Sequence, residues 1–391
     1  MKFITFQKPN IYHFFFLGYF LALFSKDCLI YYLSDNYIYK SGQLYGMYIY
    51  FFSHLLSFIP YFISKCLSKR KIKVDTINSD ETYIYNDVIT QYEDKYFFKQ
   101  ILIVSLFSFF SEAVYYIFYL INNNLDAVTT YSLGIYLILN TVVIYLVSYL
   151  LLKTYFYKHH YLSLFINSIC FLISLICDII TIIYLNKKAV NYYINILIRI
   201  IRLILLCFLF CYSKMILNSA FLSPYSLIAF RSIYEFVYLA LFSIPLIFIN
   251  IKEFNNNEDI ILKSFMQYLK GIKILYSILL LIDDYLLDLF TMFIIHKFSP
   301  SHLTLAMILE SFLNLLYKVI RNHIEVKKVY WSDYVNIGLC LFLFIGSMIH
   351  NEIFIINKYG LNTKTQLYLN NEFIDEKNNL EHMSTNSNDD E

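Results

Sequence analysis

Ten apolar runs, each long enough to cross a lipid bilayer, are the feature that most constrains the fold of this chain. Of its 391 residues 59% are hydrophobic and only 15% are charged, a balance typical of membrane proteins. Because a backbone inside a bilayer must satisfy its own hydrogen bonds, runs of about 20 apolar residues predict helices. We therefore expect an all-α membrane protein with about ten transmembrane helices, at residues 11–33, 43–67, 98–122, 129–152, 160–185, 193–217, 224–250, 270–296, 301–320 and 332–357.

The first five runs coincide with the last five when the sequence is shifted by about 172 residues, which predicts an internal repeat. This shift aligns residues 105–112, which end in Glu112, with residues 277–284, which end in Asp284. Since five crossings is an odd number, the second half must enter from the opposite side, so the repeats should be inverted. We expect a first five-helix repeat at residues 1–185 and a second at residues 186–357. A disordered polar C-terminal tail should follow at residues 358–391.

One sizeable hydrophilic loop, residues 68–97, begins with a basic cluster that includes Lys69, Arg70, Lys71 and Lys73. Positive charge accumulates on the cytosolic side of membrane proteins. The sequence therefore predicts that this loop is cytosolic, and with ten crossings both termini are cytosolic as well.

The eighth run, residues 270–296, carries Asp283, Asp284 and Asp288 near its middle. At the centre of a membrane helix each aspartate costs roughly 2.5–3.5 kcal/mol on insertion scales. In helical projection Ser277, Asp284, Asp288 and Thr291 fall in one stripe, with Asp283 to one side. We expect these aspartates to line a path for a solute, a cation or protons; the alternative is that they only hold neighbouring helices together.

Other intramembrane polar residues are secondary candidates for the same path. Glu112 can be either part of the site or a helix contact, and Arg231 and Glu235, one turn apart, can simply neutralise each other. In the ninth run Glu310 and Asn314 share a stripe deep enough to line a cavity. The full set of expected substrate- or proton-binding residues is Asp283, Asp284, Asp288, Glu112, Glu310, Asn314, Arg231 and Glu235.

Several polar residues are given no functional role by the sequence. Arg199 and Arg202 are expected to anchor the sixth run at the interface. The pair His159 and His160, together with Asp178 and Glu352, lies near helix ends and is expected to form solvated caps. The odd number of cysteines, seven, indicates apolar packing and no disulfide framework. We expect no metal site, no cofactor and no enzymatic activity, and the net charge of +2 predicts no nucleic-acid partner.

Four segments resemble the drug/metabolite transporter superfamily, and more narrowly its solute carrier 35-like branch. They are LLKTYFYKHHYLSLFINSICFLISL (151–175), SPYSLIAFRSIYEFVYLALFSIPLIFI (223–249), FSPSHLTLAMILESFLNLLYKVI (298–320) and GLCLFLFIGSMIHNEIFII (338–356). The resemblance covers nearly the whole membrane part of the chain. It implies ten helices in inverted five-helix halves, and an endomembrane location such as Golgi, vacuole or lysosome, with the plasma membrane as the alternative.

The sequence therefore predicts a multi-pass secondary transporter of a small polar metabolite or cation that works by alternating access, with protons as a candidate coupling ion. A nucleotide-sugar antiporter is the activity most often implied by the resemblance, but its substrate carries phosphates and the expected site is acidic. A non-transporting membrane scaffold with a transporter fold is the alternative from another class. The substrate and the oligomeric state stay open.

Overall fold

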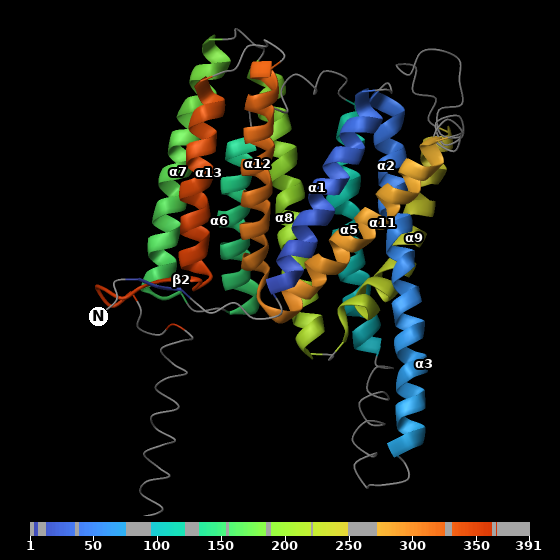
Figure 1. The fold of residues 1–391 in the computed structure, drawn as a ribbon. Helices are drawn as coiled ribbons and strands as arrows, with labels where there is room; N and C mark the ends of the chain where they lie inside the picture. The colour runs from blue at the N-terminus through green and yellow to red at the C-terminus, as the bar shows by residue number, and fades with distance from the viewer. Residues whose placement is uncertain are drawn as a thin grey trace, which may run out of the picture.

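The computed structural model describes residues 4–6, 13–35, 39–75, 95–121, 133–153, 156–184, 189–219, 222–248, 272–324, 331–361 and 365. Nearly all of these residues are helical, and the helices stand side by side as a bundle (Figure 1). The α-helices are α1 (Phe14–Asp35), α2 (Tyr39–His54), α3 (Phe58–Asp75), α5 (Lys95–Ile121), α6 (Leu133–Leu152), α7 (Lys158–Tyr184), α8 (Ala189–Ser219), α9 (Pro224–Phe248), α11 (Ile272–Lys297), α12 (Leu303–Ile324) and α13 (Trp331–His350).

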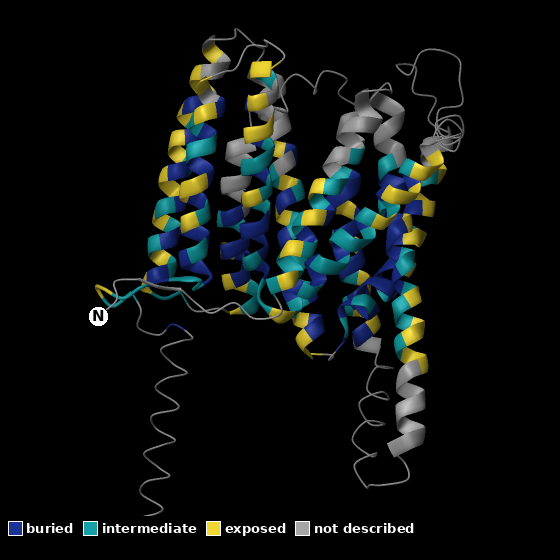
Figure 2. Ribbon diagram, viewed as in Figure 1, coloured by how far each residue is buried: buried dark blue, intermediate teal, exposed yellow. Residues whose placement is uncertain are grey.

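Seven helical segments in the described part of the chain are long and apolar enough to cross a membrane. Their outer faces are apolar as well: Phe165, Leu172 and Ile176 of α7 are all exposed, and Figure 2 shows exposed positions along the flanks of the bundle. Such surfaces are unfavourable in water but are covered by lipid in a bilayer. The described part of the chain is thus almost entirely helical, with apolar helices of membrane-spanning length, in agreement with the predicted class.

The second predicted segment, residues 43–67, is divided into two helices. A short 3₁₀ turn, η2 (Leu55–Ser57), separates α2 from α3. Pro60 explains this break, because its nitrogen cannot donate to the carbonyl one turn earlier and its ring crowds that carbonyl. The Ser57 hydroxyl donates to the carbonyl of His54 at 2.5 Å. The break places His54 at the end of α2, inside the bundle.

Helix contacts bring distant parts of the chain together. The closest partners are α1 with α11, α5 with α8, and α7 with α13. Further contacts join α6 with α7, α12 with α13, α5 with α9, α2 with α11, and α2 with α9. The largest apolar cluster includes Ile101 of α5, Leu227 of α9 and Met292 of α11, all fully buried. The two halves of the chain therefore share one core.

The chain leaves α13 earlier than the sequence predicted. After His350 it turns and forms β2 (Phe354–Ile356), which pairs antiparallel with β1 (Ile4–Phe6). The predicted segment 332–357 was therefore too long, because the apolar residues of β2 continue the apolar run of the helix. Helix α3 also extends to Asp75, so the first part of the predicted loop 68–97 is helical. Residues 76–94 and most of the polar tail lie outside the described residues.

We predict that Gly346→Ala destabilises the protein, whereas Gly338→Ala on the same helix does not. A Cβ at Gly346 would lie 2.6 Å from Asn167 Oδ1 of α7, whereas a Cβ at Gly338 meets nothing within 4 Å. Overpacking at Gly346 should lower the free energy of unfolding by about 1–3 kcal/mol, and alanine at Gly338 should favour the helix. Thermal unfolding in detergent measures both variants, and equal melting temperatures would contradict the close approach of α7 and α13.

Candidate functional site

The polar stripe of α11 faces the interior of the bundle. Ser277, Asp284, Asp288 and Thr291 are all buried, in agreement with the stripe predicted from the helical period. Asp283 lies beside the stripe and is partly buried. It accepts a hydrogen bond of 2.7 Å from the Ser25 hydroxyl of α1. Carboxylates in such an apolar environment need compensating charges or hydrogen bonds, and the neighbouring helices provide them.

Helix α1 provides a cation for Asp284. The Lys26 ammonium lies 2.6 Å from Asp284 Oδ1, and the carboxylate side chain is only 3% exposed. The same ammonium lies 5.9 Å from the centre of the Tyr50 ring of α2, within the range of a cation–π contact. Helices α1 and α11 can approach closely because Gly18 of α1 lies against Phe290 of α11. A Cβ at Gly18 would lie 2.5 Å from Phe290 Cζ.

Arg231 of α9 lies between two carboxylates. Its Nη2 is 2.5 Å from Asp288 Oδ2 of α11, and its Nε is 2.8 Å from Glu235 Oε1 one turn along α9. The Nε contact is an ion pair without hydrogen-bond geometry. Arg231 and Glu235 are completely buried. The two residues do neutralise each other, as one prediction had it, but Arg231 also binds Asp288.

His54 completes this group. Its Nδ1 lies 2.6 Å from Glu235 Oε2 and donates a hydrogen bond to it. Its Nε2 lies 3.6 Å from Asp288 Oδ2 and 3.4 Å from Arg231 Nη2. The imidazole is fully buried. Four residues from α2, α9 and α11 thus form one charged group, which we call the central group: His54, Arg231, Glu235 and Asp288.

A second ion pair lies between α5 and α8. Arg202 Nη2 donates to Glu112 Oε1 at 2.7 Å, and Glu112 is buried. The sequence predicted Arg202 as an interfacial anchor. The structure shows that its guanidinium lies against a carboxylate, because α8 crosses α5 at this point. The side chain of Arg199 lies outside the described residues.

The ninth predicted segment does not contribute to this site in the described contacts. Glu310 is partly buried on α12, where its Oε1 accepts a hydrogen bond from the Asn314 amide and its Oε2 accepts one from the Ser311 hydroxyl. Residues around it on α12 pack against α7 and α13. Of the predicted site residues, the structure therefore brings Asp288 together with Arg231 and Glu235. Asp283 and Asp284 contact α1 instead, and Glu310 binds Asn314.

Sequence reasoning missed Lys26 and His54. Both are ionisable residues within predicted membrane segments, and this placement alone makes a residue a functional candidate. Lys26 was overlooked because it lies toward the end of its run, where a long side chain normally reaches the interface. A systematic search for ionisable residues inside apolar runs would have found both.

The cysteines do not form a metal site or disulfides in the described part of the chain. Cys207 and Cys211 are buried in an apolar cluster with Ile144 and Leu203, and none of the described cysteines is joined in a disulfide. This agrees with their predicted role in packing. One group of His and Glu residues does bring three candidate ligand atoms together, namely His159, His160 and Glu352. It lies apart from the charged residues described above.

Comparisons with known proteins do not identify a family. No protein-family model matches the chain, and no curated protein sequence matches it. Its function must therefore be inferred from the geometry of the charged residues.

We predict that Lys26→Met destabilises the protein and that adding Asp284→Leu restores most of the loss. The single substitution leaves the buried Asp284 carboxylate without its cation. It should lower the free energy of unfolding by about 3 kcal/mol, the lower end of the range for broken buried ion pairs, because Lys26 is partly exposed. Thermal unfolding of the two single variants and the double variant in detergent measures the coupling. Lys65→Met, which removes an exposed lysine, is the control and should change little. A fully additive double variant would contradict this pairing.

Proposed function

We propose that this chain is a secondary transporter that moves a small polar metabolite or cation across a membrane by alternating access. Ion pairs buried inside the apolar bundle carry the proposal. Charges in membrane helices are costly, and they typically mark the path of a substrate, an ion or a proton. Here α1, α2, α5, α8, α9 and α11 all contribute ionisable side chains to such pairs.

Helix packing supports ten membrane helices arranged as two inverted repeats. If each helix of the first half is matched with its equivalent five segments later, the contact of α1 with α11 corresponds to the contact of α8 with α5. The contact of α6 with α7 then corresponds to that of α12 with α13, and α5 with α9 to α11 with α2. Pairs of equivalent contacts are expected of two related halves that pack around an axis in the membrane plane.

Two of the ion pairs, Lys26–Asp284 and Arg202–Glu112, also correspond under the proposed repeat. Glu112 and Asp284 are equivalent under the shift of about 172 residues, and each binds a cation of the helix that crosses it, Arg202 and Lys26 respectively. The central group has no such equivalent pair among the described contacts. We propose that the two equivalent pairs stabilise the halves against each other and that the central group binds the transported species.

Protonation of His54 would couple transport to a pH gradient. With Arg231 positive and both Glu235 and Asp288 negative, the central group is electroneutral only when the imidazole carries an extra proton. A neutral His54 donates to Glu235 and leaves Nε2 to accept from Arg231, whereas a protonated His54 turns an N–H toward Asp288. A bound proton would thus compete with Arg231 for Asp288.

The described contacts favour a polar or cationic solute over a nucleotide sugar. The phosphates of a nucleotide sugar require cations at the site, but Lys26, Arg202 and Arg231 each bind a carboxylate. A non-transporting scaffold is the remaining alternative, since structural ion pairs alone would also hold the helices together. Direct measurement of transport separates these three functions.

We predict that purified protein in proteoliposomes takes up one or more polar metabolites or cations faster when a pH gradient is applied. His54→Gln should abolish this stimulation, because the amide keeps a hydrogen bond to Glu235 but cannot carry the proton. His323→Gln, which removes an exposed histidine of α12, is the control and should retain the stimulation. Uptake is measured by mass spectrometry of the vesicle contents against a broad metabolite mixture.

The outcomes separate the alternatives. Uptake that is the same with and without a pH gradient would contradict the coupling, and exchange of nucleotide sugars would support the antiporter. A protein without any transport, in which neutral variants of the central group leave every cellular phenotype intact, would be a scaffold.

We also propose that the protein lies in an endomembrane and that both of its termini face the cytosol. The N-terminal strand, β2 and the end of α3 lie toward one end of the bundle (Figure 1). The α6–α7 turn lies at the same end and contains Lys153 and Lys158. Positive charges near helix ends favour the cytosolic side, so this end supports the orientation predicted from the basic residues after the second membrane segment.

We predict that glycosylation acceptor sites added at either terminus stay unmodified, whereas an acceptor site placed between α5 and α6 is modified. The first two positions should lie in the cytosol and the third in the lumen, because an odd number of proposed crossings separates the α5–α6 connection from either terminus. Mobility on gels before and after glycosidase treatment gives the result. A glycosylated C-terminal site would reverse the proposed orientation.

A further inference from the structure

Two histidines and a glutamate meet where α7 begins and α13 ends, away from the central group. Candidate ligand atoms of His159, His160 and Glu352 all lie within 4.8 Å of one another. The sequence predicted solvated helix caps here, but His159 is only 4% exposed. Residues almost two hundred positions apart thus place three metal-binding side chains together, at the edge of a small hollow that β2 also lines.

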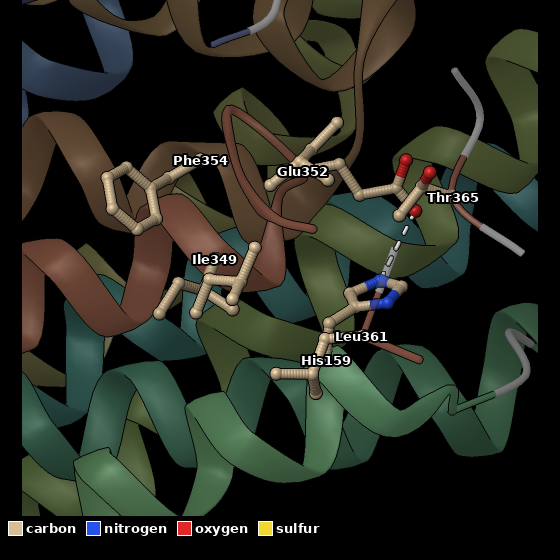
Figure 3. A pocket seen from close by; sticks show the side chains of 8 residues that line it. His159, Ile349, Glu352, Phe354, Leu361 and Thr365 are labelled. Carbon is tan, nitrogen blue, oxygen red and sulfur yellow. Dashed lines mark ion pairs between the residues drawn. The ribbon is translucent and has the colours of Figure 1, made fainter. Parts of the chain in front are cut away.

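His159 has no hydrogen-bond partner at either ring nitrogen, although it is buried. Its Nε2 lies 3.3 Å from Glu352 Oε1, without the geometry of a hydrogen bond. Figure 3 shows the carboxylate directed at the imidazole. Two ligands of one tetrahedral Zn²⁺, each bound at about 2.0–2.1 Å, are separated by about 3.3–3.4 Å. The distance between these atoms therefore matches two ligands of one ion.

His160 can provide the third ligand through Nδ1. This nitrogen accepts a hydrogen bond of 2.9 Å from the backbone N–H of Tyr157, so it carries a lone pair. Binding a metal would replace the Tyr157 N–H and draw the three ligands closer.

Glu352 is held in an unfavourable backbone conformation. Its φ of 58° lies in the left-handed region, which non-glycine residues rarely adopt. The turn is fixed by hydrogen bonds from Glu352 N to the carbonyl of Ile349 and from the Asn351 amide to the carbonyl of Ser347. The hydrogen bond from Ile353 N to the carbonyl of Met348 shows that this is a left-handed helix termination, and the turn directs the carboxylate back toward α7.

We propose that His159, His160 and Glu352 bind one divalent transition-metal ion, with Zn²⁺ as the best match. Two imidazoles and one carboxylate are a ligand set that zinc accepts, and a water molecule would complete a four-coordinate site. A bound ion joins the start of α7 to the segment after α13, and so to β2 and the N-terminal strand that pairs with it. The site is independent of the transport proposed above.

Titration of the purified full-length protein with Zn²⁺ tests the proposal. The protein is first treated with a chelator, and binding is measured by isothermal titration calorimetry together with the shift in melting temperature. We expect one bound Zn²⁺ per chain and a higher melting temperature with zinc. His159→Ala should weaken zinc binding about tenfold or more, and binding should fall at acid pH as the imidazoles protonate.

Two further variants make the result decisive. Glu352→Gln keeps the shape of the side chain and removes its charge, so it should also weaken binding and serves if His159→Ala does not fold. His323→Ala removes an exposed histidine of α12 and should bind zinc like the unaltered protein. Absence of zinc binding, or equal binding by the unaltered protein and Glu352→Gln, would overturn the proposal.

Discussion

The cost of an ionised side chain inside an apolar bundle is the constraint on which the rest of this structure depends. A single uncompensated charge would remove several kcal/mol from a protein whose total stability is of that order. In the described part of the chain, Asp284, Asp288, Glu112 and Glu235 each have a basic partner on a packed helix or one turn along their own. Helix packing and charge placement therefore depend on each other.

The two kinds of charged contact differ in their relation to the fold. Lys26 binds Asp284 where α1 crosses α11, and Arg202 binds Glu112 where α8 crosses α5. Under the proposed inverted repeat these two crossings are equivalent. His54, by contrast, belongs to an arrangement without such an equivalent among the described contacts. It also lies next to the 3₁₀ turn that Pro60 imposes. If the central group binds the transported species, as proposed, its charge can change while the Lys26–Asp284 and Arg202–Glu112 pairs continue to hold the helices together.

Local backbone features allow these contacts to form. Gly18 lets α1 approach α11 closely enough for an ion pair, and Gly346 does the same for α13 against α7. The close approach of α7 and α13 also brings His159 and Glu352 together. Small residues at helix crossings are the common means of close packing between membrane helices. The central group and the proposed metal site are thus both consequences of tight helix contacts.

The sequence by itself determined the helical class, the positions of the apolar segments and the buried stripe of α11, because length, apolar character and the period of 3.6 residues are local properties. Only the tertiary structure decided which charges meet. The pairing of Arg202 with Glu112, the place of His54 between two carboxylates and the end of α13 at His350 all depend on contacts between distant segments. Sequence spacing cannot give such contacts, since a helix face specifies a direction but not the residue that lies opposite.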